Sequence, residues 1–540
     1  MNSQKIPNAD SQTPKKVRLD FSCWNLKFAW RLVVGIWNFQ KRYPWLAELF
    51  VFVAMLALYL PLQQSTGFAD PDALYHLKIA ELTAAHGPVR EFIWMPYSTL
   101  AASFADHHFL YHVALIPFIK ILGSLHGIKF ATAVFAAAAI AALAWALRYV
   151  GVRYAALFAL LAGIMNPLAF RIGLSKASAL GVLLLVVGLA FAIKRRPWPL
   201  FAVAFIYVWT HGSWPALLGL GTIAIIMMSW NGKLISTFHV LRSSLLALWL
   251  GVIAGILINP FFPNNIKFYW EQIVQIAVIN YQAKIGVGSE WYPYNPHNLL
   301  SALPLLACLA VVAIIIFPSA AVKTVDGKEN NRIRVALALT ISALVFLGLT
   351  LRSQRHVEYF VPLAVAASAA WIGEWGFLKN MLKTKGRILP FALAVCCAVS
   401  IVGAFGRREL NSANRDLSSG YEYTLYKKAA EYLKNNAEPG EVIVHADWDD
   451  MPSLFYWNDN GRYIMGLDPT FTYRANPTRY WDYVNFTLGK SSDPVAVMKE
   501  LNSRFVFSDR EHLALDMMLK KSGSFKLVYS DNEAEVYLLK

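Results

Sequence analysis

The sequence predicts a multi-spanning α-helical membrane protein with a smaller α/β domain outside the membrane at its C-terminal end. Of the 540 residues, 56% are hydrophobic and only 16% are charged, whereas soluble domains have about 45–50% apolar and about 25% charged residues. Long apolar runs recur throughout residues 1–405, and residues 406–540 alternate between helix and strand patterns. An ordinary soluble enzyme is therefore excluded.

A helix needs about 20 mostly apolar residues to cross a bilayer, and about eleven segments approach this length. The segment 198–210 is the weakest because it is short. We expect spans at 46–63, 127–147, 154–170, 178–193, 198–210, 213–229, 243–259, 299–317, 335–351, 357–374 and 388–405.

Residues 1–45 form a basic leader before the first span. The leader has no small-residue cleavage site after a short apolar core, so we expect it to be retained in the cytoplasm rather than removed as a signal peptide. Four tryptophans, at positions 24, 30, 37 and 45, indicate that part of it forms an interfacial helix.

The distribution of charge predicts the orientation in a cell (inner) membrane. Residues 1–405 contain 33 Lys and Arg against 14 Asp and Glu, while residues 406–540 contain 17 against 20. With a cytoplasmic N-terminus, the basic loops fall on the cytoplasmic side, as the positive-inside rule requires. The loops 64–126 and 260–298 and the region 406–540 then face outward. The formal charge of +16 reflects this topology, so we expect no nucleic-acid partner.

The C-terminal region 406–540 is long enough for one small α/β domain. None of the four cysteines lies in it, so we expect no disulfide framework. We expect helices at 423–433 and 511–521, and strands at 441–445, 462–465, 505–508, 525–529 and 536–539.

Acidic residues are scarce before residue 405, so their positions carry information. Asp70 and Asp72 directly follow the first span, with His76 four residues later. Two carboxylates and an imidazole at a membrane surface can hold a divalent cation or act as a general base. The alternative is a solvated turn in which an aspartate caps the next helix.

The outer loops contain two further groups. The first loop ends in Asp106-His107-His108, and His108 and His112 have a spacing that is common for metal ligands on a helix. Packed interfacial histidines are the alternative. Glu290 lies in the second loop among aromatic, glycine and proline residues. This context indicates a loop folded over a site, and a plain exposed acid is the alternative.

Four basic residues are expected on the outer side, against the positive-inside trend. Arg352 and Arg355 lie between two late spans, and Arg171 and Lys176 follow the third span. A phosphate or diphosphate head group would explain them, because guanidinium binds phosphate oxygens through paired hydrogen bonds. For the two later arginines, an ion pair with Glu358 is the alternative.

A cluster of acids, Asp447-Trp448-Asp449-Asp450, follows a predicted strand directly. Loops at strand ends are where α/β domains commonly build sites. The indole of Trp448 could stack on a sugar or pack against an acceptor side chain. Capping of the next helix by Asp449 or Asp450 is the competing interpretation.

These motifs, in this order, resemble those of the catalytic subunit of oligosaccharyltransferase and, more broadly, the GT-C class of polyprenyl-phosphate-dependent glycosyltransferases. Asp72 resembles the first acidic motif of the family. Ser289-Glu290 is similar to its Ser-x-Ser-Glu loop over the donor site, and Arg355 to the arginine that contacts the donor phosphate. The segment 447–450 stands where the family has its Trp-Trp-Asp acceptor motif.

The second acidic motif of the family should follow the third span, where this sequence reads Arg-Ile-Gly-Leu-Ser-Lys at 171–176. Three explanations are open. One metal ligand is missing, or Asp106-His107-His108 replaces it, or no metal is used and Lys176 supplies the charge. The tryptophan motif is also degenerate, so the acceptor can be a protein, a lipid or a polysaccharide of the envelope.

The resemblance implies an inverting membrane glycosyltransferase of the GT-C fold that transfers a sugar or glycan from a polyprenyl-phosphate or polyprenyl-diphosphate donor. Together with the charge pattern described above, it gives Asp72, Asp70 and Glu290 as the expected catalytic residues, Arg355, Arg352, Lys176 and Arg171 as the expected donor-phosphate ligands, and Asp447, Trp448, Asp449 and Asp450 as the expected acceptor contacts. A Mg2+ or Mn2+ ion would be held among Asp72, Glu290, Asp106, His107 and His108.

Two other functions fit parts of the sequence. A transporter or flippase could use Asp70, Asp72, His211 and Arg355 as a polar pathway, and a non-catalytic envelope scaffold could bind glycan through its C-terminal domain. The polar residues gather at one outer face, whereas transporter sites lie near the middle of the membrane. We therefore favour the enzyme.

Overall fold

The computed structural model describes residues 43, 45–229, 234–322, 327–374 and 388–540. The chain divides into two compact units, Met1–Ala47 and Glu48–Lys540, and nearly all described residues belong to the second. The interfacial helix predicted within the leader 1–45 falls almost entirely outside the described residues.

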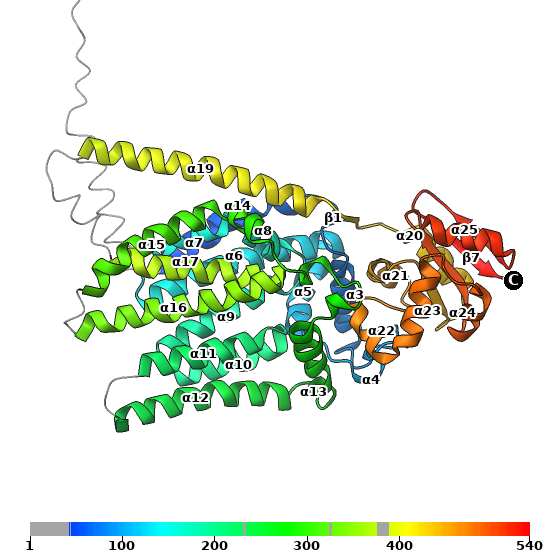
Figure 1. Cartoon of the computed structure of the whole chain (residues 1–540), viewed down its shortest axis with the longest axis horizontal. Helices are drawn as coiled ribbons and strands as arrows, with labels where there is room; N and C mark the ends of the chain where they lie inside the picture. Colours follow the sequence, from blue (N-terminus) through cyan, green and yellow to red (C-terminus); the bar gives the residue numbers. More distant parts are fainter. Residues whose placement is uncertain (1–42, 44, 230–233, 323–326, 375–387) are drawn as a thin grey trace, which may run out of the picture. The chain divides into compact units, whose positions relative to one another are not determined.

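A bundle of apolar helices makes up most of the chain before residue 405 (Figure 1). Helices are the expected form for such segments, because lipid offers no partner to an unpaired backbone group. The long members are α2 (Trp45–Tyr59), α6 (Ser124–Val150), α9 (Ser178–Ile193), α10 (Pro197–Thr210), α11 (Trp214–Ser229), α12 (Leu234–Leu257), α15 (Pro304–Val322), α16 (Gly327–Arg352), α17 (Val357–Glu374) and α19 (Ile388–Ser418).

Within the described residues, three helical segments are long and apolar enough to cross a membrane: Trp45–Gln63, Ser124–Val150 and Asn331–Arg352. A bent pair of helices gives a fourth candidate, and several further apolar helices have 10–17 residues. The structure thus has the apolar helices of a multi-pass protein, while the number of about eleven spans stays a prediction.

The bent pair replaces the single helix expected at 154–170. α7 (Ala155–Gly163) and α8 (Asn166–Gly173) meet at an angle of 75°. Pro167 has no N–H and disfavours the helical conformation in the residue before it, so it fits the first turn of α8 but not the middle of one long helix. The break brings the end of α8, with Arg171, toward the C-terminal domain.

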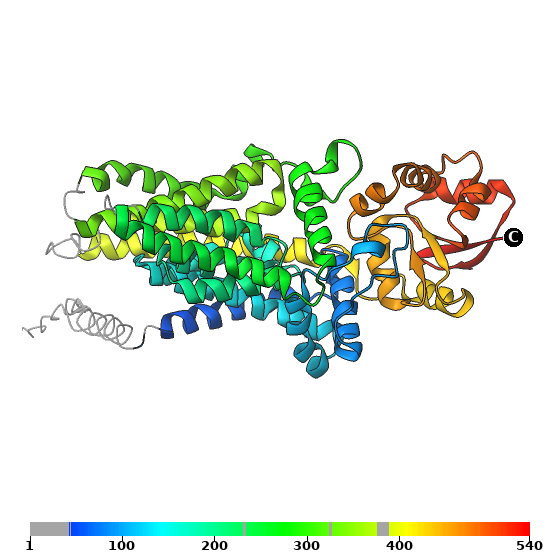
Figure 2. The ribbon, with the colours of Figure 1, turned by 90° about the horizontal axis from the view of Figure 1, so that it is seen from below.

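The two predicted outer loops contain helices of their own (Figure 2). Between residues 64 and 126 lie α3 (Asp72–His86), α4 (Leu100–Ser103) and α5 (Phe109–Leu122). Between residues 260 and 298 lie α13 (Asn264–Tyr269), the π-helix η2 (Trp270–Ile279), and the short turns η3 (Tyr281–Ala283) and η4 (Ser289–Trp291), followed by the start of α14 (Pro296–Ala302).

The C-terminal domain contains a five-stranded sheet in the order β4-β3-β5-β7-β6. Each predicted strand is present: β3 (Val442–His445), β4 (Arg462–Tyr463), β5 (Ser503–Asp509), β6 (Phe525–Ser530) and β7 (Ala534–Leu539). β3 runs parallel to β4 and β5, and β7 runs antiparallel to β5 and β6.

Six helices belong to the same domain as this sheet (Figure 1): α20 (Lys427–Asn436), α21 (Met451–Trp457), α22 (Pro469–Ala475), α23 (Pro477–Thr487), α24 (Pro494–Glu500) and α25 (Leu513–Ser522). The predicted helices at 423–433 and 511–521 correspond to α20 and α25, with shifted ends.

The boundary expected at residue 405 lies inside α19, which continues as one helix to Ser418. Directly after it, β2 (Tyr421–Glu422) pairs with β1 (Gly67–Phe68), the segment just before α3. Gly420 permits this contact, because its φ is +128° and a Cβ there would lie 2.5 Å from the carbonyl oxygen of Phe68. The pairing brings the start of α3 beside the entrance to the C-terminal domain.

Candidate active site

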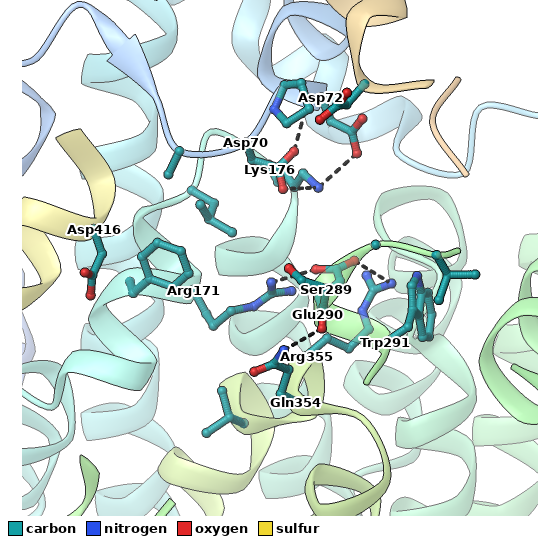
Figure 3. A pocket seen from close by; sticks show the side chains of 18 of the residues that line it. Asp70, Asp72, Arg171, Lys176, Ser289, Glu290, Trp291, Gln354, Arg355 and Asp416 are labelled. Atoms are coloured by element: carbon teal, nitrogen blue, oxygen red, sulfur yellow. Dashed lines mark hydrogen bonds and ion pairs between the residues drawn. The ribbon is translucent and has the colours of Figure 1, made fainter. Parts of the chain in front are cut away.

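A cavity of about 540 Å3, here called the polar cavity, lies where the helix bundle meets the C-terminal domain (Figure 3). Segments far apart in the sequence contribute to it, including the start of α3, α8 with the loop after it, η4 and the turn after α16. Its charged lining residues are Asp70, Asp72, Arg171, Lys176, Glu290, Arg355, Asp416, Asp449 and Asp468.

The ammonium of Lys176 lies between two aspartates (Figure 3). Its Nζ is 2.6 Å from Asp70 Oδ2 and 2.9 Å from Asp72 Oδ2. Asp70 also accepts a hydrogen bond from the Asp72 amide at 3.0 Å through Oδ1. Asp70 thus accepts from the first residue of α3 and also pairs with the lysine, while the N-cap position of this helix is Pro71 and has no side-chain cap.

Asp72 differs from Asp70 because one of its two carboxylate oxygens accepts no hydrogen bond from the described residues. Its Oδ1 is shielded from solvent and has no hydrogen-bond partner among the described residues. Burial raises the pKa of Asp72 to about 6, although Lys176 opposes the rise. A carboxylate with a pKa near neutrality and an unused oxygen is suited to accept a proton.

A second charged group is centred on Glu290 (Figure 3). Glu290 Oε2 is 2.7 Å from Arg171 Nη1, and Oε1 is 3.3 Å from Arg355 Nη1. Burial raises the pKa of Glu290, but the cations Arg355, Arg171 and Lys176 together hold it well below its usual range. Glu290 is therefore an anion that orders two arginines.

The two arginines differ in how many of their donors are already used. Arg171 also donates from Nε to Glu358 at 3.0 Å, and Glu358 is fully buried. Arg355 makes the longer contact to Glu290 and stacks its guanidinium 4.5 Å from the centre of the Trp291 ring. Arg355 therefore keeps more donors for a ligand than Arg171 does.

This arrangement changes one expectation. The alternative paired Glu358 with Arg352 or Arg355, but its ion-pair partner is Arg171. Arg352 donates instead to the carbonyl of Val278 at the end of η2, and it does not line the polar cavity.

The turn that carries Arg355 is held against the loop of Glu290. Ser353 Oγ donates to the Glu290 carbonyl at 2.9 Å. Gln354 donates twice: its backbone N–H to the Tyr292 carbonyl at 2.9 Å, and its side-chain amide to the Ser289 carbonyl. These backbone contacts fix the position of both side chains. Gln354 is not among the residues that the sequence predicts for the site, because no pattern around it distinguishes its side chain.

The acidic cluster of the C-terminal domain divides into two parts. Trp448 and Asp449 line the polar cavity, and Tyr421 donates its hydroxyl hydrogen bond to Asp449. Asp447 and Asp450 form a capping box at the turn before α21 and do not line the cavity. The capping interpretation is therefore right for Asp450 and not for Asp449, which faces the cavity, and Asp447, expected as an acceptor contact, is the partner of Asp450 in the cap.

Asp106 and the histidines near it form hydrogen bonds mainly with one another. Asp106 Oδ2 is 2.6 Å from His112 Nδ1, and His112 Nε2 is 2.8 Å from His76 Nδ1. Asp106 Oδ1 accepts the amide hydrogen of His108 at 3.0 Å. Both carboxylate oxygens of Asp106 are thus used locally, while His107 and His108 line a small cavity of about 110 Å3 that Asp72 and Lys176 also line.

The side chains present do not fit the expected divalent cation. Such an ion needs several free oxygen ligands, yet Asp70 and Asp72 hold an ammonium and Glu290 holds two guanidinium groups. Within the part of the chain that the structure describes, no three His, Cys, Asp or Glu residues form a group able to hold a metal ion.

A second cavity of about 480 Å3, here called the apolar cavity, lies between α11, η2 and α16. Aliphatic and aromatic side chains line it along α11 and α16, and Arg352, His356 and Tyr359 line it near the C-terminal end of α16. Arg355 and Trp291 line both this cavity and the polar cavity. A ligand with an apolar tail and an anionic head group can therefore contact both cavities at Arg355.

No protein-family model and no curated protein sequence matches this chain. Several solved structures resemble it, including the following three. The apo oligosaccharyltransferase of Archaeoglobus fulgidus has a TM-score of 0.59 and 13% identity, with 93% of this chain and 75% of that chain covered. ArnT of Cupriavidus metallidurans bound to undecaprenyl phosphate has a TM-score of 0.52 and 14% identity, with 91% and 97% covered.

The third is the arabinofuranosyltransferase AftD from mycobacteria, which has a TM-score of 0.54 and 12% identity, with 91% of this chain and 40% of that chain covered. The chain has the GT-C fold. At these identities the likeness concerns the fold alone, and it confirms the fold that the sequence motifs implied. A GT-C fold with apolar helices is that of a multi-pass membrane protein.

Proposed function

We propose that the protein is a membrane glycosyltransferase that takes a sugar or glycan from a polyprenyl-phosphate-linked donor and transfers it to an envelope acceptor on the outer face of the membrane. The observation that carries this proposal is the position of Arg355, which lines an apolar cavity and a polar cavity that contains Asp72. A donor with an apolar tail, a phosphate and a sugar needs these three environments in this order. The similar structure of ArnT was solved with undecaprenyl phosphate bound.

Arg355 is the residue best placed to hold the donor phosphate. Its side chain is partly exposed, and its one ion pair, among the described residues, is the 3.3 Å contact to Glu290. Arg171 is already committed to Glu290 and Glu358, so we assign it the positioning of Glu290. Arg352 lies in the apolar cavity, where it can meet the phosphate from the tail side.

Asp72 is the proposed base. The acceptor O–H or N–H gives its proton to the Asp72 carboxylate, and the electron pair left on the acceptor forms the new bond to the anomeric carbon. The bond from that carbon to the phosphate oxygen breaks, and its electrons remain on the polyprenyl phosphate. Arg355 stabilises the charge that develops on this leaving group. Attack from the face opposite the phosphate inverts the anomeric centre.

Trp448 and Asp449 are the proposed acceptor contacts, since they reach the same cavity from the C-terminal domain. The acceptor class stays open among glycans, lipids and proteins. The cavity has a volume of about 540 Å3, and its lining offers both an aromatic face and several carboxylates.

The test uses the full chain reconstituted in liposomes with a radiolabelled polyprenyl-phosphate sugar and envelope extract from a deletion strain as the acceptor source. We expect transfer by the wild type, loss of transfer in Asp72→Asn, and loss of donor binding in Arg355→Ala. Asp482→Asn, in α23 away from the cavity, is the matched control. Unchanged transfer in Asp72→Asn, or donor binding retained in Arg355→Ala, would overturn the assignment.

A further inference from the structure

We propose that the ammonium of Lys176 takes the place of a divalent cation in this chain, so that the transfer reaction runs without a metal ion. This inference rests on the proposed function for its catalytic meaning. Its structural part, that the site excludes a divalent cation, stands separately and can be tested without any transfer reaction.

The first support is the geometry of the ion pairs. Lys176 Nζ contacts Asp70 Oδ2 at 2.6 Å and Asp72 Oδ2 at 2.9 Å, so one positive charge bridges two carboxylates. A Mg2+ ion between the same oxygens would have to lie about 2.1 Å from each of them. The ammonium already occupies that space, and it would repel a second cation.

The second support is the rigidity of the segment that delivers the lysine. Leu174, Ser175 and Ala177 are all buried. The Lys176 amide donates to the Leu174 carbonyl at 2.7 Å, and the Ser175 hydroxyl is 3.2 Å from that of Thr132 on α6. The lysine backbone is therefore packed in place beside α6, within reach of the two aspartates.

The third support is the balance of charge. A lysine side chain has an ordinary pKa of about 10.4, so the Lys176 ammonium is positively charged at neutral pH, and it contacts the carboxylates of both Asp70 and Asp72. Without it, Asp70 and Asp72 would face each other unpaired.

The fourth support concerns what the ammonium can still do. A lysine ammonium has three N–H donors, and the described residues accept from it only through Asp70 and Asp72. Lys176 also lines both the polar cavity and the small cavity shared with Arg355. The third N–H is therefore available to a phosphate or acceptor oxygen, which is the contact that a metal ion would otherwise make.

The first experiment measures metal binding by the purified full chain in nanodiscs, using electron paramagnetic resonance of Mn2+. We expect no stoichiometric site in the wild type and one site in Lys176→Asp, which would supply a third carboxylate. The double variant Lys176→Asp/Asp72→Asn should lose that site. Stoichiometric Mn2+ binding by the wild type at the same concentrations would overturn the inference, and this result needs no enzymatic activity.

The second experiment measures transfer with EDTA and with added Mg2+ or Mn2+. We expect the wild-type rate to change by less than about twofold, and Lys176→Gln to fall by about 100-fold without recovery on adding metal, the size of effect seen when one transition-state donor is lost. Transfer that stops in EDTA and returns with Mg2+ would refute the inference.

Two outcomes separate this inference from the proposed function. If the wild type transfers no sugar under any condition, the proposed function fails, while the Mn2+ measurement still decides whether the site excludes a metal. If Lys176→Asp does not fold, as judged by size-exclusion profile and thermal unfolding, the wild-type binding and EDTA measurements decide the question.

Discussion

Replacing Arg171 with methionine should destabilise the protein strongly, because it leaves a buried carboxylate without its counter-ion. Glu358 is 0% exposed, and Arg171 Nε lies 3.0 Å from its Oε2. Two unit charges about 3 Å apart attract by about 5 kcal/mol at an effective dielectric constant of about 20. Removing one member of a buried pair costs about 3–5 kcal/mol in measured cases, so we expect a loss of that size in the free energy of unfolding.

The double variant Arg171→Met/Glu358→Gln makes the reasoning testable. Because glutamine carries no charge, the double variant should be more stable than Arg171→Met alone. The free energy of unfolding is measured by chemical denaturation of the full chain in detergent, followed by tryptophan fluorescence. The exposed pair Lys427–Glu431 on α20, 3.9 Å apart, is the matched control and should show little coupling. A coupling energy for the buried pair no larger than that of the control pair would refute the reasoning.

Three further predictions follow from the site. Transfer should decline as the pH falls below about 6, because Asp72 has its pKa raised to about 6 and can accept a proton only when ionised; a flat pH–rate profile from pH 5 to 8 would contradict this. Gly420→Ala should lower the stability by about 1–3 kcal/mol, since its backbone is left-handed and a Cβ would clash with Phe68, and thermal unfolding measures it. Asp447→Ala should cost about 1 kcal/mol of stability through loss of the capping box, whereas Asp449→Ala should lose only the hydrogen bond from Tyr421 and raise the KM for the acceptor; an unchanged KM in Asp449→Ala would contradict its role.

The sequence contained enough to place most of the charged groups of the site. Acids are rare before residue 405, so Asp70, Asp72 and Glu290 stood out, and the outward cations Lys176 and Arg355 stood out for the same reason. All five line one cavity in the structure. Rare charged residues mark the site because burying a charge in an apolar region is costly, so the few charged side chains found there pair with one another.

The partners of these groups could not be read from the sequence. Glu358 and Arg171 are 187 residues apart and meet only because α8 is broken from α7 and packs beside α17. Gln354 and Tyr421 carry no local pattern that distinguishes them from ordinary polar residues. Long-range contacts of this kind depend on how the helices pack, which one sequence does not encode in any local pattern.

Hydropathy and charge patterning by themselves determined that this chain is a membrane helix bundle with a C-terminal α/β domain, because helix and strand periods and the cost of burying charge act locally. The tertiary structure decided the order of the strands and the extension of α19 past residue 405. It also decided which residues of segment 447–450 form the capping box and which line the cavity. The same holds for Lys176. Its charge was evident from the sequence, but only the tertiary structure decided that this charge stands between two aspartates, where the acidic residues of the sequence had suggested a metal ion.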